Sequence, residues 1–311
     1  MTGDEPRWFL PNGTARRDGC EVVVDDSLPS WQHTGLRVLV LDADQSWAVE
    51  EPGWEYVVVP LAGAASVGCV ERGGEEHQAD LAGRASVFAG PTDVAYVPAG
   101  SRLTVTGTAR VTRIAVCAAR VRGRGPTAAF RHVAAAEVPV ELRGAGSCSR
   151  EVRNFGVPET LAADSIIACE VVTPAGNWSS YPPHKHDEER AGVETELEEI
   201  YYFETQVAAG ADAARTGPVH PVGYQRVYGN AARPIEVFAE VRTGDVVLVP
   251  HGWHGPSMAA PGYDLYYLNV MAGPGDERAW LICDDPSHGW VRQTWEGQAV
   301  DPRLPLGGDP R

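Results

Sequence analysis

The stretch AEVRTGDVVLVPHGWHGPS, residues 239–257, contains a Gly-Asp turn, a short apolar strand and a second turn around Pro250 and Gly252. A stretch with similar parts in the same order, VFAGPTDVAYVPAGSRLTV, occupies residues 87–105. Elsewhere, short runs of Val, Ile, Tyr and Thr recur between Gly, Pro and Asp, and helical periodicity is scarce. The pattern predicts an all-β protein built from two tandem jelly-roll barrels.

The boundary between the two barrels is expected in CAARVRGRGPTAAFRHVAAAEVPVELRGAGS, residues 117–147, where Gly, Ala and Arg interrupt the strand pattern. We expect one barrel over residues 1–145 and the other over residues 146–311, with a segment near residues 130–145 bridging them. A chain of 311 residues is long enough for two such domains.

The composition limits the partners. The formal charge is −16 and the pI is near 5.0, which disfavours nucleic acid and anionic membranes. A small acidic substrate would therefore need a locally basic pocket. The 6 cysteines form no CxxC pair, so we expect reduced thiols. Neither a signal peptide nor a long apolar run is visible, and we expect a cytoplasmic protein; a homo-oligomer is left open.

Two histidines carry the first chemical signal. His184 and His186 flank Lys185, the only lysine of the chain, in SSYPPHKHDEER (residues 179–190). Residues two apart in a β-strand project from the same face, which brings two imidazoles within reach of one ion. The pair is therefore a candidate for metal binding.

Further ligand types follow downstream. ELEEIYYFE, residues 196–204, has the composition of a strand and carries Glu198 and Glu199. His254 then follows the Pro-Gly turn described above. Three neutral imidazoles and one carboxylate would hold a divalent transition metal and leave open positions for a substrate.

This order of parts resembles the metal site of the cupin superfamily. Two departures are present: the gap from His186 to the glutamate is long, and Gly252 lies one residue closer to His254 than is common. The resemblance implies two tandem cupin domains, a bicupin. It also implies one divalent metal per chain, with zinc favoured and manganese or iron as alternatives. The matching residues are Gly176, His184, His186, Glu199, Gly244, Pro250, Gly252 and His254.

A narrower resemblance covers about residues 177–274. NWSSYPPHKHD, LEEIYYF, GYQRVYG and PGYDLYYLNVMAGP look like the 5-deoxy-D-glucuronate isomerases of bacterial inositol catabolism, which are related to the uronate ketol-isomerases of pectin breakdown. The resemblance implies an aldose–ketose isomerase that converts 5-deoxy-D-glucuronate, a small sugar acid, to 5-dehydro-2-deoxy-D-gluconate. A cupin dioxygenase, another metal-dependent sugar-acid enzyme and a non-catalytic sugar-binding cupin remain alternatives.

The choice of carboxylate ligand stays open. Strand periodicity sends Glu198 and Glu199 to opposite faces, so only one of them faces the metal. Alignment with the superfamily through EEIYY favours Glu199, whereas an alignment with the pectin-pathway enzymes runs through Glu198.

The implied reaction moves a proton from C2 to C1, so it needs a base, and a cation must hold the carboxylate of the substrate. We expect the base among Glu198, His251, Tyr181 and Tyr266. We expect substrate contacts from Arg226, Gln225 and His220, which lie between the metal-bearing strands.

Lys185 is expected to be structural. Strand alternation points it away from the face of the two histidines, so an ion pair with Asp187 or Glu188 is favoured over proton transfer.

The first barrel is expected to be metal-free. It offers only His33 and His77, which are far apart in the sequence and have no acidic neighbours of ligand type.

Overall fold

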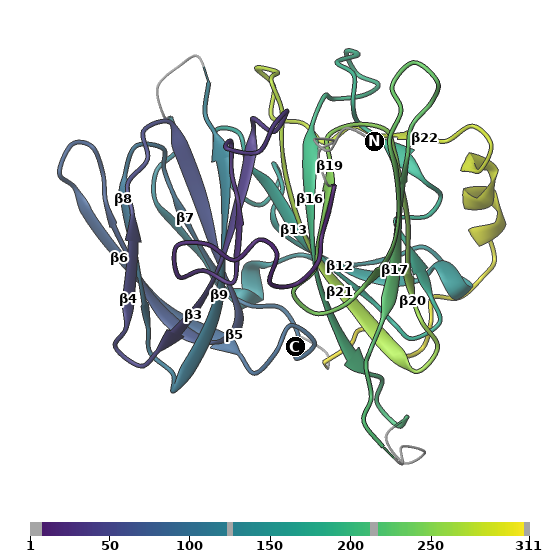
Figure 1. Cartoon of the computed structure of the whole chain (residues 1–311), viewed down its shortest axis with the longest axis horizontal. Coiled ribbons are helices and arrows are strands. Elements are labelled where there is room, and N and C mark those ends of the chain that lie inside the picture. Colours follow the sequence, from purple (N-terminus) through teal and green to yellow (C-terminus); the bar gives the residue numbers. More distant parts are fainter. Residues whose placement is uncertain (1–7, 123–126, 212–216, 308–311) are drawn as a thin grey trace.

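The computed structural model describes residues 8–122, 127–211 and 217–307, and its regular structure is almost entirely β-strand. Figure 1 shows two barrels side by side, the first in purple and blue and the second in teal, green and yellow. The predicted all-β class with two tandem barrels is confirmed. Within the described residues, no helix has the length and apolar character needed to cross a membrane.

The first barrel is a single hydrogen-bonded system of 9 strands. Its longest strand, β5 (Trp54–Val70), pairs with β7 and β9 near its start and with β6 and β8 near its end, so it bends from one wall of the barrel to the other. The other strands are β2 (Val22–Val24), β3 (Thr34–Asp42), β4 (Ser46–Val49), β6 (Glu76–Arg84), β7 (Val94–Val97), β8 (Arg102–Gly107), β9 (Val111–Arg120) and β10 (Arg131–Val133).

The second barrel has two separate sheets. The inner sheet has the order β1-β19-β16-β21-β13-β12-β11, and the outer sheet has the order β18-β17-β20-β15-β22 with β14 beside β20. Its strands are β1 (Phe9–Leu10), β11 (Val140–Arg143), β12 (Arg150–Gly156), β13 (Ile167–Thr173), β14 (Trp178–Ser179), β15 (His184–Lys185), β16 (Glu198–Val207), β17 (Gly223–Tyr228), β18 (Glu236–Val241), β19 (Val246–Val249), β20 (Trp253–Ala259), β21 (Tyr263–Ala272) and β22 (Cys283–Asp284). Short 3-10 helices are η1 (Ala135–Glu137), η2 (Gly146–Cys148) and η4 (Gly289–Trp295).

The inner sheet of the second barrel is buried on both faces. On the face toward the first barrel, Ile200 and Tyr202 of β16 share an apolar core with Val57 of β5. On the opposite face, Tyr201 and Phe203 belong to the core inside the second barrel. Successive residues of β16 therefore alternate between two different apolar environments, as the period of two of a β-strand requires.

The chain passes from one barrel to the other between β10 and β11. β10 pairs with β7 of the first barrel, whereas β11 pairs with β12 of the second. The N-terminal strand β1 also belongs to the second barrel, because Phe9 pairs with Val247. The division at residue 145 stays a prediction, and these pairings assign both β1 and β11 to the inner sheet.

A buried carboxyl group of the second barrel holds a turn of the first. Glu198, at the start of β16, accepts hydrogen bonds from the consecutive backbone N–H groups of Gln32, His33 and Thr34 at 3.1, 2.6 and 2.7 Å. The Thr34 hydroxyl donates a further bond to the same carboxyl group, at 3.0 Å. Glu198 thus connects the barrels by satisfying backbone donors that the protein interior hides from water.

A second carboxyl group makes the reciprocal connection. Glu55, at the start of β5 in the first barrel, accepts from the backbone N–H groups of Asp164, Ser165 and Ile166 at 3.0, 2.6 and 2.5 Å. The Tyr96 hydroxyl also donates to it, at 2.6 Å. Each barrel therefore inserts one glutamate into a turn of the other.

An ion network also crosses the interface between the barrels. The Arg84 guanidinium of the first barrel forms a two-pronged ion pair with Glu170 of β13, and both side chains are almost fully buried. Arg153 contacts Glu151 at 2.7 Å and approaches Glu170 at 3.5 Å, while the Tyr266 hydroxyl donates to Glu170 at 2.7 Å. The guanidinium groups and the tyrosine hydroxyl compensate for the desolvation of the buried glutamate.

We expect Glu198→Ala to destabilise the protein by about 3 kcal/mol, since each buried donor left without a partner costs about 1–3 kcal/mol. The expected change is a lower midpoint of urea denaturation with no loss of bound metal, because Glu198 faces the first barrel. Glu196→Ala, which removes an exposed carboxylate two residues earlier, is the matched control. Equal stability of the two variants would contradict the role of Glu198 as a connection.

Candidate metal centre

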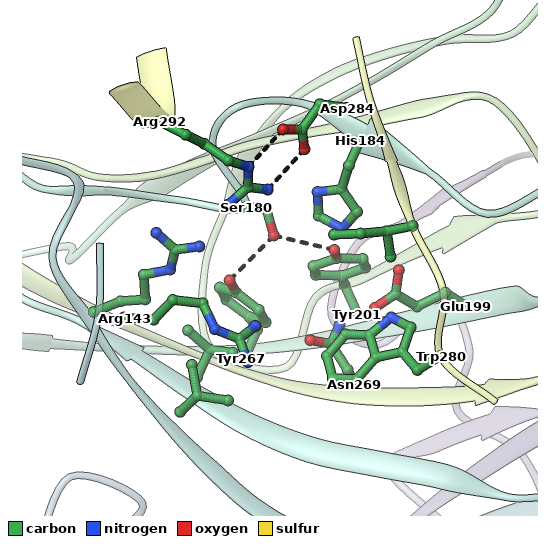
Figure 2. Close-up of a pocket in the computed structure, with 14 residues that line it drawn as sticks. Arg143, Ser180, His184, Glu199, Tyr201, Tyr267, Asn269, Trp280, Asp284 and Arg292 are labelled. Atoms are coloured by element: carbon green, nitrogen blue, oxygen red, sulfur yellow. Dashed lines mark hydrogen bonds and ion pairs between the residues drawn. The ribbon is translucent and has the colours of Figure 1, made fainter. Parts of the chain in front are cut away.

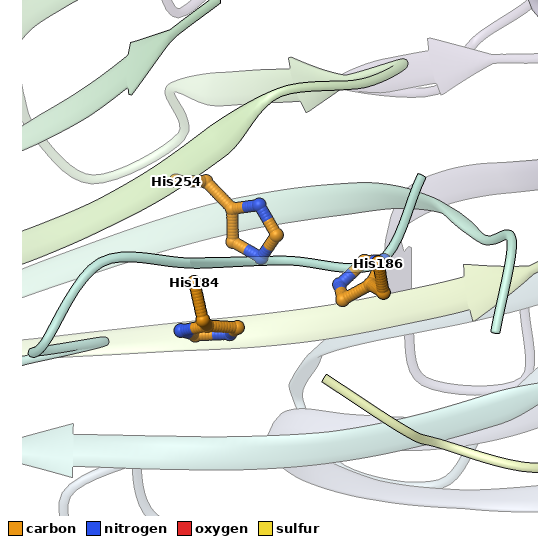
Figure 3. A group of neighbouring side chains, drawn as sticks. All are labelled: His184, His186 and His254. Atoms are coloured by element: carbon orange, nitrogen blue, oxygen red, sulfur yellow. The ribbon is translucent and has the colours of Figure 1, made fainter. Parts of the chain in front are cut away.

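Three histidines meet inside the second barrel. His184 of β15, His186 just after it and His254 of β20 each offer a ring nitrogen, and these atoms lie within 4.8 Å of one another. Figure 3 shows the imidazole rings of His184 and His186 turned toward that of His254. The pairing of β15 with β20 causes the encounter, because His184 and His254 are direct cross-strand partners. The spacing of two that the sequence offered therefore brings both strand histidines to one centre.

Glu199 completes the cluster. Its Oε2 atom lies 3.2 Å from the Nε2 atom of His186 and 3.2 Å from the Nε2 atom of His254. Burial opposes its ionisation, but the hydrogen bonds and charges of the two histidines prevail and lower the pKa of Glu199 to about 2. The carboxylate is therefore ionised and faces the imidazoles, whereas Glu198 points to the first barrel.

Backbone carbonyl groups orient two of the imidazole rings. The Nδ1 atom of His186 lies 3.1 Å from the carbonyl oxygen of Leu197, and the Nδ1 atom of His254 lies 3.2 Å from that of Gly252. A proton on each Nδ1 satisfies these carbonyl groups and leaves the Nε2 lone pairs directed at the centre of the cluster. The His254 Nε2 atom is buried and has no hydrogen-bond partner within the described residues.

These features fit a divalent transition metal. Nitrogen–metal bonds of about 2 Å require ligand atoms at the mutual separations seen in the cluster. Burial, together with the nearby His254 and His186, holds the pKa of His184 well below its usual range, so its ring is neutral and able to coordinate.

Lys185 lies outside the cluster and stabilises its frame. Its Nζ atom contacts Asp187 Oδ1 at 2.5 Å and Glu194 Oε1 at 2.8 Å. The other oxygen of Asp187 accepts a hydrogen bond from the backbone N–H of Gly252 at 2.9 Å. The predicted ion pair with Asp187 is thus present, and through Asp187 it ties the strand of the histidine pair to the turn that precedes His254.

A cavity of about 420 Å³ opens beside the cluster. Its wall contains two members of the cluster, His184 and Glu199, together with hydroxyl groups, a carboxamide and arginines, as Figure 2 shows. The lining residues are Arg143, Arg150, Val152, Val171, Ser180, His184, Glu199, Tyr201, Tyr267, Asn269, Trp280, Ile282, Asp284 and Arg292.

A row of three hydroxyl groups follows one wall of this cavity. The Ser180 Oγ atom lies 3.2 Å from the Tyr201 hydroxyl and 3.2 Å from the Tyr267 hydroxyl, so it bridges them (Figure 2). Ser180 has a positive φ of 45°, and the neighbouring Gly255 leaves its backbone space, since a Cβ atom there would lie 1.8 Å from the Ser180 carbonyl oxygen. The local backbone therefore fixes the serine between the tyrosines.

The structure does not bring the expected bases to this cavity. Glu198 and Tyr266 face the first barrel, because each occupies the alternate face of its strand. Tyr181 packs near Trp178, and half-buried His251 lies in a surface groove beside β18.

The expected substrate contacts also lie elsewhere. Arg226 is exposed, and its guanidinium stacks over the Tyr228 ring at 4.4 Å. Gln225 points into the barrel but accepts a hydrogen bond from the Ser257 hydroxyl and does not line the cavity. His220 is an exposed loop residue.

Sequence reasoning missed the residues that do line the cavity with the cluster. Tyr201 was signalled by its parity with Glu199, two residues earlier on the same face of β16. Tyr267 pairs with Phe203 of that face across the inner sheet, and this pairing cannot be seen without the register of β16 and β21. Arg150 gave no local signal at all.

In the first barrel, the expectation that His77 has no acidic neighbours is wrong. Its Nε2 atom lies 3.1 Å from Glu71 and 3.7 Å from Glu75, because the β5–β6 hairpin brings residues on both sides of its turn together. This group is partly exposed, whereas the interior of the barrel is filled by an apolar core that includes Tyr56. That the first barrel is metal-free stays a prediction.

Comparisons with known proteins agree with this site and fold. The KduI/IolB family matches residues 8–291. The chain belongs to this family. A curated relative from Geobacillus kaustophilus, named 5-deoxy-glucuronate isomerase, is 39% identical over 93% of this chain and 96% of its own length.

Solved structures extend the comparison of the KduI/IolB chain. An IolB-like protein from Salmonella typhimurium has a TM-score of 0.76 and 33% identity, and the match covers 91% of this chain and 98% of that one. An oxalate decarboxylase from Lactobacillus farciminis has a TM-score of 0.63 at 12% identity, covering 91% and 89% of the two chains, and shares the fold. The family resemblance expected from the sequence is confirmed.

We expect His254→Ala to remove most of the bound metal, because the substitution deletes a buried ring nitrogen that has no other partner. Elemental analysis of the purified KduI/IolB protein measures the effect. His77→Ala, a change in the first barrel, is the control and should leave the metal content unchanged. Full metal occupancy in the His254→Ala protein would show that the cluster is not the metal site.

We expect Lys185→Met to retain the metal and at least about a tenth of the wild-type rate, because its amine contacts Asp187 and Glu194 outside the cavity. Loss of a general base costs roughly a hundredfold to ten-thousandfold. Steady-state rates with parallel metal analysis separate these outcomes, and Arg190→Met, which removes another cation from Glu194, is the matched control. A loss beyond a hundredfold with metal bound would make the lysine catalytic.

Proposed function

We propose that this protein is a 5-deoxy-glucuronate isomerase, which converts 5-deoxy-D-glucuronate to 5-dehydro-2-deoxy-D-gluconate in inositol catabolism. The observation that carries the proposal is the buried cluster of histidines and Glu199 at the wall of a cavity that also holds hydroxyl groups and arginines. The names of the curated relatives support the same activity.

The proposed cofactor is one divalent metal ion, held by His184, His186, His254 and Glu199. Zinc is favoured, and manganese and iron accept the same ligand set. The bound ion supplies Lewis acidity, which makes the C2 hydrogen of the aldehyde sugar acid removable and stabilises the negative charge that develops on the adjacent oxygen atoms.

The residues of the cavity wall orient the sugar chain. Ser180 can accept a proton from one tyrosine and donate its own to the other or to a substrate hydroxyl, so the row formed with Tyr201 and Tyr267 can redistribute oxygen-bound protons. Asn269 is 3% exposed, lines the cavity, and its Nδ2 atom has no hydrogen-bond partner within the described residues. That amide is free to donate to a substrate hydroxyl.

Burial of the tyrosine hydroxyl groups matters for this role. Burial and the charge of Glu199 raise the pKa of Tyr201 well above its usual range, and burial raises the pKa of Tyr267. Both hydroxyl groups therefore keep their protons at neutral pH. They act as hydrogen-bond donors that hold sugar oxygens rather than as permanent anions.

We expect the metal-loaded protein to convert 5-deoxy-D-glucuronate to its ketone isomer reversibly and without dioxygen. Nuclear magnetic resonance in deuterated water follows the aldehyde and the ketone, and deuterium in the new methylene group measures exchange with solvent. A chelator and the His254→Ala substitution should each suppress turnover.

The same measurements test the other functions. A cupin dioxygenase would consume dioxygen and stop under anaerobic conditions. A sugar-binding cupin would retain its ligand after chelation and show no turnover. Either result would overturn the proposed isomerase activity.

A further inference from the structure

Arg150 occupies an unusual electrostatic position in the wall of the cavity. It is the first residue of β12, it is 5% exposed, and its cross-strand partner on β11 is another arginine, Arg143. A third arginine, Arg292 of η4, lines the same cavity. Like charges directly opposite each other in a sheet repel, so the pair requires compensation by negative charge.

Two of these arginines have carboxylate partners. Arg143 binds Glu141 at 2.6 Å, and Arg292 makes a two-pronged contact with Asp284 at 2.5 and 2.7 Å. Figure 2 shows the Arg292–Asp284 pair above the hydroxyl row. Their charges are therefore balanced by the protein itself.

Arg150 lacks such a partner. Its Nη1 atom donates to the carbonyl oxygen of Cys148 at 3.0 Å, and its guanidinium lies over the Trp295 ring at 5.6 Å. In the part of the chain that the structure describes, no carboxylate oxygen lies within 4.0 Å of Arg150. A buried guanidinium with one carbonyl contact and several unused N–H groups is costly for a folded protein.

The surroundings of Arg150 confirm the imbalance. Burial, together with the charges of Arg143 and Arg292, lowers the pKa of Arg150 to about 10, although the nearby Tyr267 acts in the opposite direction. The side chain still carries its charge at neutral pH. An anion that entered the cavity would relieve both the desolvation and the repulsion.

The β11–β12 turn keeps this position accessible to the arginine. Gly144 has a φ of +80°, and a Cβ atom there would lie 2.7 Å from the Arg150 Nη1 atom and 2.2 Å from the Cys148 carbonyl oxygen. A side chain at residue 144 would displace the guanidinium. The turn therefore provides room for a charged group that the protein leaves unpaired.

We infer that Arg150 binds the carboxylate of the substrate and makes the cavity selective for aldehyde sugars that end in a carboxylate. The assignment rests on the proposed isomerase function and replaces Arg226 as the candidate for this contact. A guanidinium suits the role because its planar N–H groups match both oxygens of a carboxylate.

The hydroxyl row gives the substrate its direction. Glu199 is close enough to Tyr201 to raise its pKa, Ser180 joins Tyr201 to Tyr267, and Tyr267 lies near Arg150. The order along the wall is thus metal cluster, hydroxyl row, Arg150. A six-carbon uronate placed along it has C1 and C2 at the cluster, its middle hydroxyl groups at the row and its carboxylate at Arg150.

The test compares two substrates with the metal-loaded wild type and the Arg150→Met variant. The substrates are 5-deoxy-D-glucuronate and the neutral aldose in which a CH2OH group replaces the carboxylate. We expect wild-type kcat/KM to favour the acid by about a hundredfold or more, as for a desolvated charge pair. In Arg150→Met the KM for the acid should rise about a hundredfold, while turnover of the neutral aldose stays within about threefold of wild type.

Two controls exclude a loss of charge in general and a structural role. Arg131→Met removes an exposed arginine of β10 in the first barrel and should leave both substrates unaffected. Because Arg150 is unpaired, Arg150→Met should melt within about 2 °C of wild type or above it. The C1 alcohol of the substrate, which cannot be isomerised, should raise the melting temperature of wild type but not of Arg150→Met.

The outcomes separate this assignment from the proposed function. If wild type turns over the acid and Arg150→Met keeps the same preference for it, the assignment is overturned and the isomerase stands. Unfolding of Arg150→Met would equally overturn it, since that result makes the arginine structural. If wild type turns over neither substrate, the isomerase fails, and stabilisation by the C1 alcohol that depends on Arg150 would still support a carboxylate site.

Discussion

Burial of one β-sheet on both faces is the constraint on which the structure depends. Each inner-sheet strand must supply apolar side chains to two cores, so neighbouring residues have different environments and different tasks. The adjacent Glu198 and Glu199 show this most clearly. One satisfies backbone N–H groups of the first barrel, and the other faces the histidines of the second. A register shift of one residue in β16 would exchange the two carboxylates and lose both functions.

The sequence predicted those features that depend on short-range periodicity. The barrels followed from short strands between turn residues, and His184 and His186 followed from a spacing of two. His254 and the glutamate pair were found because they lie at recognisable turns and strand starts. The correct carboxylate could only be narrowed to Glu198 or Glu199, since parity says that they face opposite sides but not which side holds the site.

The rest of the site depends on long-range register. Tyr267 reaches the cavity and Tyr266 does not, although nothing in the sequence YDLYYLNV distinguishes the two tyrosines. Arg226 belonged to a motif between metal-bearing strands and still faces solvent. Arg150 comes from β12, which joins the site only through its pairing with β13 and β11. The composition did anticipate its chemistry, because a strongly acidic protein must concentrate positive charge locally to bind an acid.

The position of β1 has a consequence for how the chain acquires its structure. Asn12 donates its backbone N–H to Asp245 across 233 residues of sequence, and Phe9 pairs with Val247. The edge of the metal-bearing barrel is therefore closed by the part of the protein that leaves the ribosome first. During synthesis this segment waits, unpaired, until β19 emerges. Such contacts have high contact order and form late, so the second barrel is completed only when nearly the whole polypeptide is available.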